Sequence, residues 1–164
     1  MPILDPNTIE FISNGPEQTR RLGIRLGSLL NIGDVLCLRG DLGSGKTTFV
    51  QGLAKGWGSL DQVTSPTFII VNMYRKSDGQ NLYHLDAYRL QDEMEAEDLD
   101  VDLMVTNGVM VIEWPEHILG ALPDEQLWIN FSWISDQKRR LVFDPKSDCY
   151  QELLLEFRRQ AFGG

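Results

Sequence analysis

The stretch G-D-L-G-S-G-K-T, from Gly40 to Thr47, follows an apolar run and precedes a segment with helical periodicity. It matches G-x-x-x-x-G-K-[ST] at every fixed position. Glycines in such a loop let backbone N–H groups surround phosphate oxygens, and the N-terminus of the next helix adds its positive end. The run from Asp34 to Arg39 predicts a strand covered on both faces. A helix is expected from about Lys46 to Ala54, closing near Gly56 to Gly58. Together they predict a P-loop that holds a nucleoside triphosphate.

The residues of this loop have different expected tasks. The Lys46 ammonium reaches the β- and γ-phosphates in such sites, and the Thr47 hydroxyl ligates Mg²⁺. Backbone groups of the rest of the loop and of the next residue surround the phosphates. The predicted nucleotide-contacting residues of the loop are Asp41, Leu42, Gly43, Ser44, Gly45, Lys46, Thr47 and Thr48.

A P-loop site also needs a carboxylate for Mg²⁺ or its waters, usually at the end of an apolar strand. Two strands end in this way, V-M-V-I-E at Val109 to Glu113 and L-Y-H-L-D at Leu82 to Asp86. Glu113 has the better pattern, because its strand is apolar on both faces. Both carboxylates stay candidates for metal binding and, with Lys46, for catalysis; a helix cap or a surface ion pair is the alternative for each.

Two further features are expected near the nucleotide. The segment V-T-S-P-T-F, Val63 to Phe68, lies where P-loop proteins place a nucleotide-sensing loop. Thr67 in it is suited to reach Mg²⁺ or the γ-phosphate, and a plain loop is the equal alternative. Trp114 follows Glu113 directly and packs either near the nucleotide or in the core.

The remaining pattern predicts an α/β protein, a three-layer P-loop NTPase fold with a mixed parallel and antiparallel sheet, as one domain over residues 1–164. Asp78-Gly79 and the region of Asp136 predict turns of two hairpins. The expected elements are strands at 8–13, 34–39, 68–74, 82–87, 109–112, 126–133 and 140–143, and helices that begin near Pro16, Lys46, Asp92, Pro115 and Asp148.

Composition limits the classes of function. A hydrophobic content of 42% and a charged content of 24% are typical of a globular protein. The formal net charge of -9 argues against direct binding of a nucleic-acid backbone. Met1 to Pro6 lacks a signal-peptide pattern, no apolar run is long enough for a membrane span, and the two cysteines are far apart. A cytoplasmic protein is expected.

Lys138 to Arg140, the densest basic cluster, is either a hairpin surface or a lid that touches phosphates.

Four stretches resemble, in order and spacing, the TsaE family, bacterial ATPases that act in the formation of N6-threonylcarbamoyladenosine beside the tRNA anticodon. The stretches are G-D-L-G-S-G-K-T-T-F at Gly40 to Phe49, S-P-T-F at Ser65 to Phe68, Y-H-L-D-A-Y-R-L at Tyr83 to Leu90, and I-E-W-P-E at Ile112 to Glu116. The set covers nearly 80 residues. Each motif alone is common, but the four in this order are highly specific.

The resemblance implies a P-loop fold that hydrolyses ATP with Mg²⁺ and works with the partner proteins TsaB and TsaD, of which TsaD carries out the transfer reaction. It also implies that Asp86 and Glu113 are the site carboxylates, that Trp114 lies near the nucleotide and that Ser65 to Phe68 acts as a switch. Weak turnover by the chain alone is expected, because no arginine is an obvious arginine finger. The alternatives are a P-loop kinase of small molecules or nucleosides, and a GTP-driven switch, against which the lack of an N-K-x-D-like motif argues.

Overall fold

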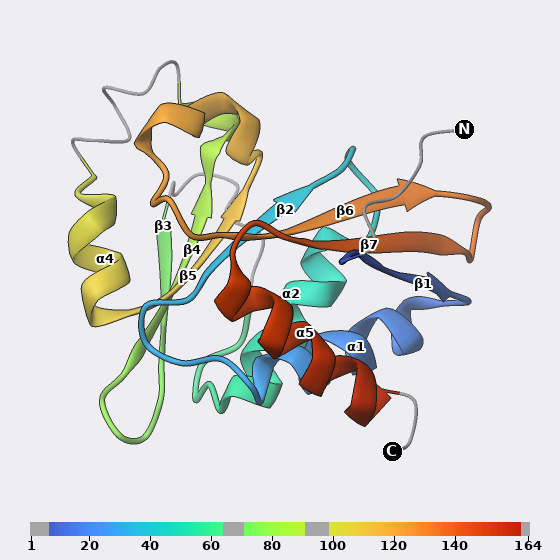
Figure 1. Cartoon of the computed structure of the whole chain (residues 1–164), viewed down its shortest axis with the longest axis horizontal. Helices are drawn as coiled ribbons and strands as arrows, with labels where there is room; N and C mark the ends of the chain where they lie inside the picture. The colour runs from blue at the N-terminus through green and yellow to red at the C-terminus, as the bar shows by residue number, and fades with distance from the viewer. Residues whose placement is uncertain (1–6, 64–70, 91–98, 162–164) are drawn as a thin grey trace.

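The computed structural model describes residues 7–63, 71–90 and 99–161. Its centre is a seven-stranded mixed sheet with the strand order β1-β7-β6-β2-β5-β4-β3 (Figure 1). The expected α/β class and mixed sheet are confirmed. The strands are β1 (Ile9–Ser13), β2 (Val35–Arg39), β3 (Val71–Arg75), β4 (Asn81–Asp86), β5 (Gly108–Glu113), β6 (Leu127–Trp133) and β7 (Arg139–Pro145). The helices are α1 (Pro16–Gly27), α2 (Lys46–Trp57), α4 (Val101–Asn107) and α5 (Asp148–Ala161), with 3-10 helices η1 (Ala87–Arg89) and η2 (Pro115–Ala121).

Parallel strands form the middle of the sheet. Strand β2 pairs in parallel with β5 on one side and β6 on the other, and β4 pairs in parallel with β5. Their carboxyl ends therefore meet at one edge of the sheet, where ligands bind in open α/β sheets. The two predicted hairpins are the antiparallel part: β3 pairs with β4 and β6 pairs with β7, which also pairs with β1.

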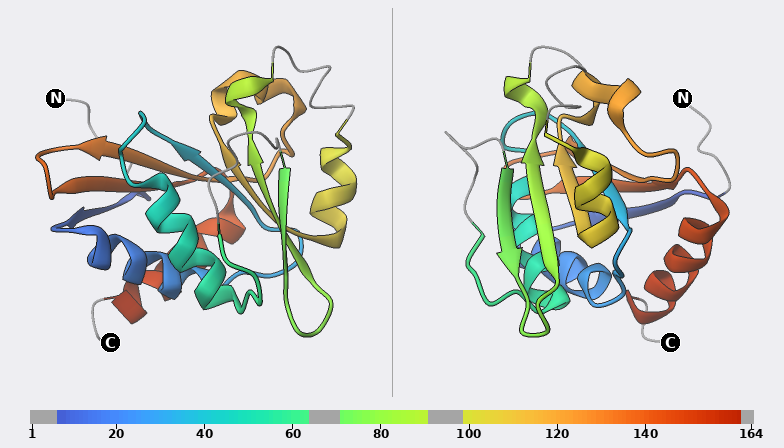
Figure 2. Two further views of the ribbon diagram at one scale, coloured as in Figure 1. Left: turned by 180° about the vertical axis from the view of Figure 1, so that it is seen from behind. Right: turned by 90° about the vertical axis from the view of Figure 1, so that its left-hand side faces the viewer.

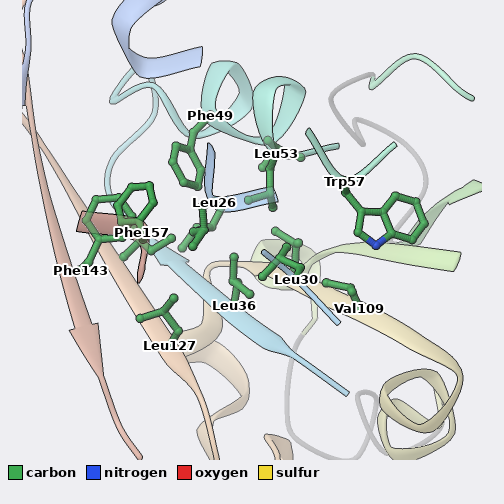
Figure 3. Packing of buried hydrophobic residues seen from close by; sticks show 14 of the residues in the cluster. Leu26, Leu30, Leu36, Phe49, Leu53, Trp57, Val109, Leu127, Phe143 and Phe157 are labelled. Carbon is green, nitrogen blue, oxygen red and sulfur yellow. The ribbon is translucent and has the colours of Figure 1, made fainter. Parts of the chain in front are cut away.

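Apolar side chains on the two faces of the sheet form two clusters. Helices α1, α2 and α5 cover one face, where Leu26, Phe49 and Leu53 pack over Leu36 of β2 (Figure 3). Helix α4 and η2 cover the other face (Figure 2). There Ile118 packs in a smaller cluster with residues of β2, β4 and β5. Because central strands are covered on both sides, β5 is buried along its whole length. The apolar pattern of Val109–Glu113 predicts this burial on both faces.

Helices α1 and α2 approach each other closely through glycines. A Cβ atom added at Gly52 would lie 2.0 Å from the Arg20 carbonyl oxygen, and one at Gly27 would lie 2.0 Å from the Leu53 carbonyl oxygen. No larger residue fits at either position without moving a helix. The pairing fixes the N-terminus of α1 next to the N-terminus of α2, which begins at the predicted P-loop.

One expected helix boundary needs correction. Of the acidic helix expected from Asp92 to Val105, residues 91–98 lie outside the described part. Leu99 and Asp100 form a turn, so the expected helix is not continuous to Val105. Asp100 has a left-handed φ of 59°, its carboxylate accepts a hydrogen bond from the Leu103 N–H, and helix α4 starts after it at Val101. Helix α2 ends at Trp57, and Gly58 closes it with a φ of 106°, where the glycines predicted its end. Within the described ranges, no helix combines the length and the apolar character needed to cross a membrane.

Candidate functional site

A cavity of about 280 Å³ lies at the carboxyl edge of the central strands. The end of the P-loop and the first turn of α2 form its floor. The ends of β4 and β5 border it on one side, and the start of α1 and the β6–β7 turn border it on the other. Its lining residues are Gly15, Pro16, Thr19, Leu42, Gly43, Gly45, Lys46, Thr47, Thr48, Asp86, Glu113, Trp114, Asp136, Gln137 and Arg139.

The P-loop takes a shape that requires glycine. Gly45 precedes α2 with a φ of 103°, in the left-handed region that a side chain disfavours. Gly40 lies against β6, where an added Cβ would approach the Phe131 carbonyl oxygen to 2.8 Å. The chain can therefore turn tightly from β2 into α2. This turn brings the first residues of α2, with the positive end of the helix, to the cavity wall.

Lys46 is the cation at the centre of the cavity. Its side chain is only 5% exposed, its Nζ donates to the Gly40 carbonyl oxygen at 2.5 Å, and the ammonium lies 4.2 Å from the centre of the Trp114 ring. Burial lowers the pKa of Lys46, and the carboxylates of Glu113, Glu116, Asp86 and Asp41 oppose this shift. The ammonium thus has a carbonyl, a ring and several acidic groups around it, with no direct ion pair among the described residues. An incoming phosphate would complete its coordination.

Glu113 is held in place by a buried hydrogen-bond chain. One carboxylate oxygen lies 2.6 Å from Nε2 of His84, and Nδ1 of His84 lies 3.0 Å from the Tyr74 hydroxyl. His84 is fully buried and Glu113 is 7% exposed. A neutral imidazole satisfies every partner if the Tyr74 hydroxyl donates to Nδ1 and Nε2–H donates to Glu113. These two hydrogen bonds restrict the Glu113 side chain to one orientation at the cavity wall.

Asp86 ends β4 beside Glu113, with which it is in register across the β4–β5 pair. Its Oδ1 accepts a hydrogen bond from the Tyr88 N–H at 3.0 Å, which starts η1. Both carboxylates line the cavity together with Thr47. Carboxylate and hydroxyl oxygens are hard donors of the kind that Mg²⁺ prefers. Among the described residues, no group of three or more His, Cys, Asp or Glu side chains is placed to hold a metal by itself. A metal here would take its remaining ligands from water or from a bound phosphate.

Trp114 has a strained backbone. Its φ of 58° lies in the left-handed region, a costly conformation for a bulky residue. The ring centroid lies 5.1 Å from that of Tyr88 and 5.9 Å from that of His117. This conformation turns the chain sharply after Glu113 and puts the ring over Lys46.

Arg139 approaches the P-loop from the opposite side. Its Nε donates to the Gly43 carbonyl oxygen at 3.2 Å, and its Nη1 donates to carbonyl oxygens of Ser135 at 2.6 Å and Lys138 at 3.0 Å. Its neighbour Arg140 instead pairs with Glu10 of β1 at 3.0 Å. The basic cluster is therefore divided, with Arg139 at the cavity and Arg140 on the sheet.

The structure brings most of the predicted site residues to this cavity. Those that line it are Leu42, Gly43, Gly45, Lys46, Thr47, Thr48, Asp86, Glu113 and Trp114. Asp41 and Ser44 instead line a neighbouring hollow of about 650 Å³ beside β6. Thr67 and the rest of Ser65 to Phe68 lie outside the described residues.

The sequence interpretation did not find the α1 wall or the contact of His84 with Glu113. It did mark the β6–β7 turn, through the hairpin expected near Asp136 and the basic cluster from Lys138 to Arg140. The wall of the cavity beside α1 is made by Gly15, Pro16 and Thr19, which no motif marks.

A glycine-rich loop between a buried strand and a helix, with two strand-end carboxylates beside it, places the chain in the P-loop NTPase fold class. The sequence model of a family described as "Threonylcarbamoyl adenosine biosynthesis protein TsaE" matches residues 13–141. The chain belongs to the TsaE family.

Two curated relatives and one crystal structure agree with this assignment. A Bacillus subtilis tRNA threonylcarbamoyladenosine biosynthesis protein TsaE is 40% identical over 145 residues, which are 88% of this chain and 90% of the relative. The Streptomyces coelicolor protein of the same name is 46% identical over 110 residues, 66% of this chain and 74% of the relative. The crystal structure of Bacillus subtilis YdiB is similar with a TM-score of 0.78 and 33% identity, covering 94% of this chain and 96% of that one.

Proposed function

We propose that the chain binds ATP with Mg²⁺ and hydrolyses it, as a subunit of the machinery that forms N6-threonylcarbamoyladenosine in tRNA. The observation that carries the proposal is the cavity in which Lys46, Thr47, Asp86 and Glu113 meet at the N-terminus of α2. P-loop sites for nucleoside triphosphates combine these residue types. Family membership supplies the biological setting.

Binding of the phosphates depends on Lys46 and on the start of α2. In the structure the Lys46 ammonium is held at the Gly40 carbonyl and over Trp114, so it is already inside the cavity. Backbone N–H groups at the start of α2 add donors and the positive end of the helix dipole. Since burial lowers the pKa of Lys46, a bound phosphate would stabilise its charged form.

The two carboxylates have separate proposed tasks. Glu113, held by His84, orients the attacking water and accepts its proton. Asp86 and the Thr47 hydroxyl are the proposed Mg²⁺ ligands, directly or through water. When bound, Mg²⁺ would neutralise charge on the phosphates. The hydrogen bond to His84 is the observation that favours Glu113 as the base, because it fixes the orientation of the side chain.

The acidic composition indicates which subunits of the machinery bind the tRNA. With a net charge of -9, the chain is a poor binder of a tRNA backbone. We therefore propose that TsaB and TsaD hold the tRNA and perform the transfer, and that this chain couples ATP hydrolysis to their cycle. Within the described residues, Arg139 is the one arginine that lines the cavity, and its guanidinium already donates to backbone carbonyls of Gly43, Ser135 and Lys138. This arrangement supports weak turnover by the chain alone.

Phosphate release tests the proposal. ATP is given to the chain alone and to the chain with TsaB and TsaD, each with Mg²⁺ and with Mg²⁺ removed by a chelator. The expected result is slow, Mg²⁺-dependent release by the chain alone and a higher rate in the complex. Vigorous hydrolysis by the chain alone would contradict the coupling, and transfer of the phosphate to a small-molecule acceptor would favour a kinase. Preference for GTP in a competition assay would refute the choice of ATP.

A further inference from the structure

We propose that the hollow of about 650 Å³ beside β6, called the outer hollow below, receives an arginine side chain of a partner protein. The inference rests on the proposed work of the chain with partner proteins, and it names the chemistry of one contact between them. It follows from unpartnered oxygens in the wall of the outer hollow, from the exposed side chains at its rim and from its position against the P-loop.

Two buried oxygens of residues that line the outer hollow have no hydrogen-bond partner among the described residues. They are Oγ of Ser44 and Oδ1 of Asn130. Ser44 is only 3% exposed, and it lines the outer hollow but not the nucleotide cavity, so a nucleotide there is not placed to satisfy its hydroxyl. Because a buried acceptor without a donor destabilises the free chain, a ligand that donates to these oxygens gains binding energy.

The lining also contains the carboxylate of Asp41, which forms no ion pair among the described residues. Arg39 is the one cation among the described lining residues; it is exposed and pairs with none of these oxygens. The lining thus offers a carboxylate, an amide oxygen and a hydroxyl to an incoming donor. A guanidinium carries five N–H donors in a planar fork, so it can satisfy several of these acceptors at once, and its charge complements that of Asp41.

Two exposed apolar side chains at the rim indicate that the occupant is a protein. Leu42 is 86% exposed and Trp133 is 60% exposed, and both line the outer hollow. A small ligand is mostly enclosed by its site, whereas side chains this open are covered only by another macromolecule. The Trp133 ring offers a face to a cation, and tryptophan and arginine are enriched among the residues that dominate protein interfaces. The net charge of -9 argues against a nucleic acid in this place.

The P-loop is the wall that the outer hollow shares with the nucleotide cavity. It leaves β2 beside the carboxyl end of β6 (Figure 1), and Leu42 lines both spaces. A Cβ atom added at Gly40 would lie 2.8 Å from Oγ of Ser44 and 2.8 Å from the Phe131 carbonyl oxygen, so the loop packs directly on β6. A guanidinium bound to Asp41 and Ser44 therefore contacts the P-loop from outside while the phosphates contact it from within. The contact couples the partner to the nucleotide without placing the arginine at the phosphates.

The first test measures the affinity of the chain for a mixture of TsaB and TsaD by calorimetry. Asn130→Ala and Trp133→Ala should each weaken this binding about tenfold, while the ATP affinity of the chain alone stays within about twofold. The matched controls are Asn31→Ala, before the opposite end of β2, and Leu155→Ala, an exposed apolar residue of α5; both should bind normally. The urea midpoint of free Asn130→Ala should not fall, because the Oδ1 that it removes accepts no hydrogen bond within the described part of the chain.

The second test identifies the group that enters the outer hollow. Trp133→p-benzoylphenylalanine is cross-linked by light to the TsaB and TsaD mixture, and mass spectrometry should find the cross-link beside an arginine. That arginine, changed to glutamine, should weaken binding as much as Asn130→Ala does, and the two changes together should cost less than their sum. A cross-linked segment without arginine, or additive losses, would overturn the inference.

Other results separate this inference from the proposed function. Unchanged binding of TsaB and TsaD by both Asn130→Ala and Trp133→Ala overturns the inference alone, and a parallel loss of ATP affinity assigns the outer hollow to the nucleotide site. A lowered urea midpoint of Asn130→Ala makes Asn130 a structural residue. If the unsubstituted chain hydrolyses ATP but does not bind TsaB and TsaD, the inference and the coupling fail while the ATPase activity stands. If it binds them through the outer hollow but does not hydrolyse ATP, the inference stands and the ATPase proposal fails.

Discussion

The two ends of the cavity differ in how the chain builds them. At the carboxylate end, Lys46, Asp86 and Glu113 come from short motifs at the ends of neighbouring strands. At the hairpin end, the α1 start and the β6–β7 turn are about 120 residues apart in sequence and meet only because β1 pairs with β7. One end is therefore specified by local sequence and the other by topology.

The ends also differ in how their side chains are held. Glu113 is fixed by a buried side-chain network through His84 and Tyr74. Arg139 is fixed by backbone carbonyls at a half-buried position. Substitutions at the carboxylate end should thus abolish steps of the reaction, and those at the hairpin end should reduce affinity by degrees.

The largest effect is expected for Lys46→Ala. Because Lys46 is the central cation of the cavity, its loss should weaken ATP binding by about a hundredfold or more. The fold should persist, since the hydrogen bond that is lost ends on a loop carbonyl. Calorimetry measures the affinity and circular dichroism the unfolding transition. Lys55→Ala, at an exposed position of the same helix, is the control and should bind normally. Unchanged ATP affinity in Lys46→Ala would refute the site.

Glu113→Gln should affect turnover more than binding. The amide keeps the shape of the side chain but cannot take a proton, so kcat should fall about a hundredfold while the ATP affinity changes little. Asp86→Asn should instead raise the Mg²⁺ concentration needed for half-maximal rate. Single-turnover assays over a series of Mg²⁺ concentrations separate the loss of rate in Glu113→Gln from the weaker Mg²⁺ binding in Asp86→Asn. A stronger Mg²⁺ effect in Glu113→Gln than in Asp86→Asn would reverse the assigned roles.

His84 is expected to act through Glu113 as a positioning residue. His84→Leu removes the hydrogen bond at 2.6 Å and should lower kcat about tenfold, with KM for ATP nearly unchanged. His84→Gln retains a side-chain N–H donor and should recover part of the rate. A purely structural role would lower stability and change kcat and KM together, or would give no recovery with glutamine.

The sequence predicts the carboxylate end of the cavity better than the hairpin end. The P-loop, the strand-end carboxylates and both hairpins follow from residue patterns within about ten positions, and these placements agree with the structure. The acidic helix expected up to Val105 is interrupted, because Asp100 adopts a left-handed conformation that propensity does not predict. The Glu113–His84 contact and the Arg139 position depend on strand order. A single sequence without homologues carries no local signal for strand order.

The smallest effect on the site, and the most telling for the hairpin end, is expected for Gly52→Ala. Helix propensity alone predicts that this change stabilises α2 by roughly 1 kcal/mol. Packing predicts the opposite, because the new Cβ would lie 2.0 Å from the Arg20 carbonyl oxygen and must displace α1. We expect a loss of about 1–3 kcal/mol in the free energy of unfolding, measured with urea. Since Pro16 and Thr19 at the start of α1 line the cavity, ATP affinity should fall a few fold. A stabilised variant with normal ATP binding would show that the spacing of α1 and α2 does not set the hairpin end.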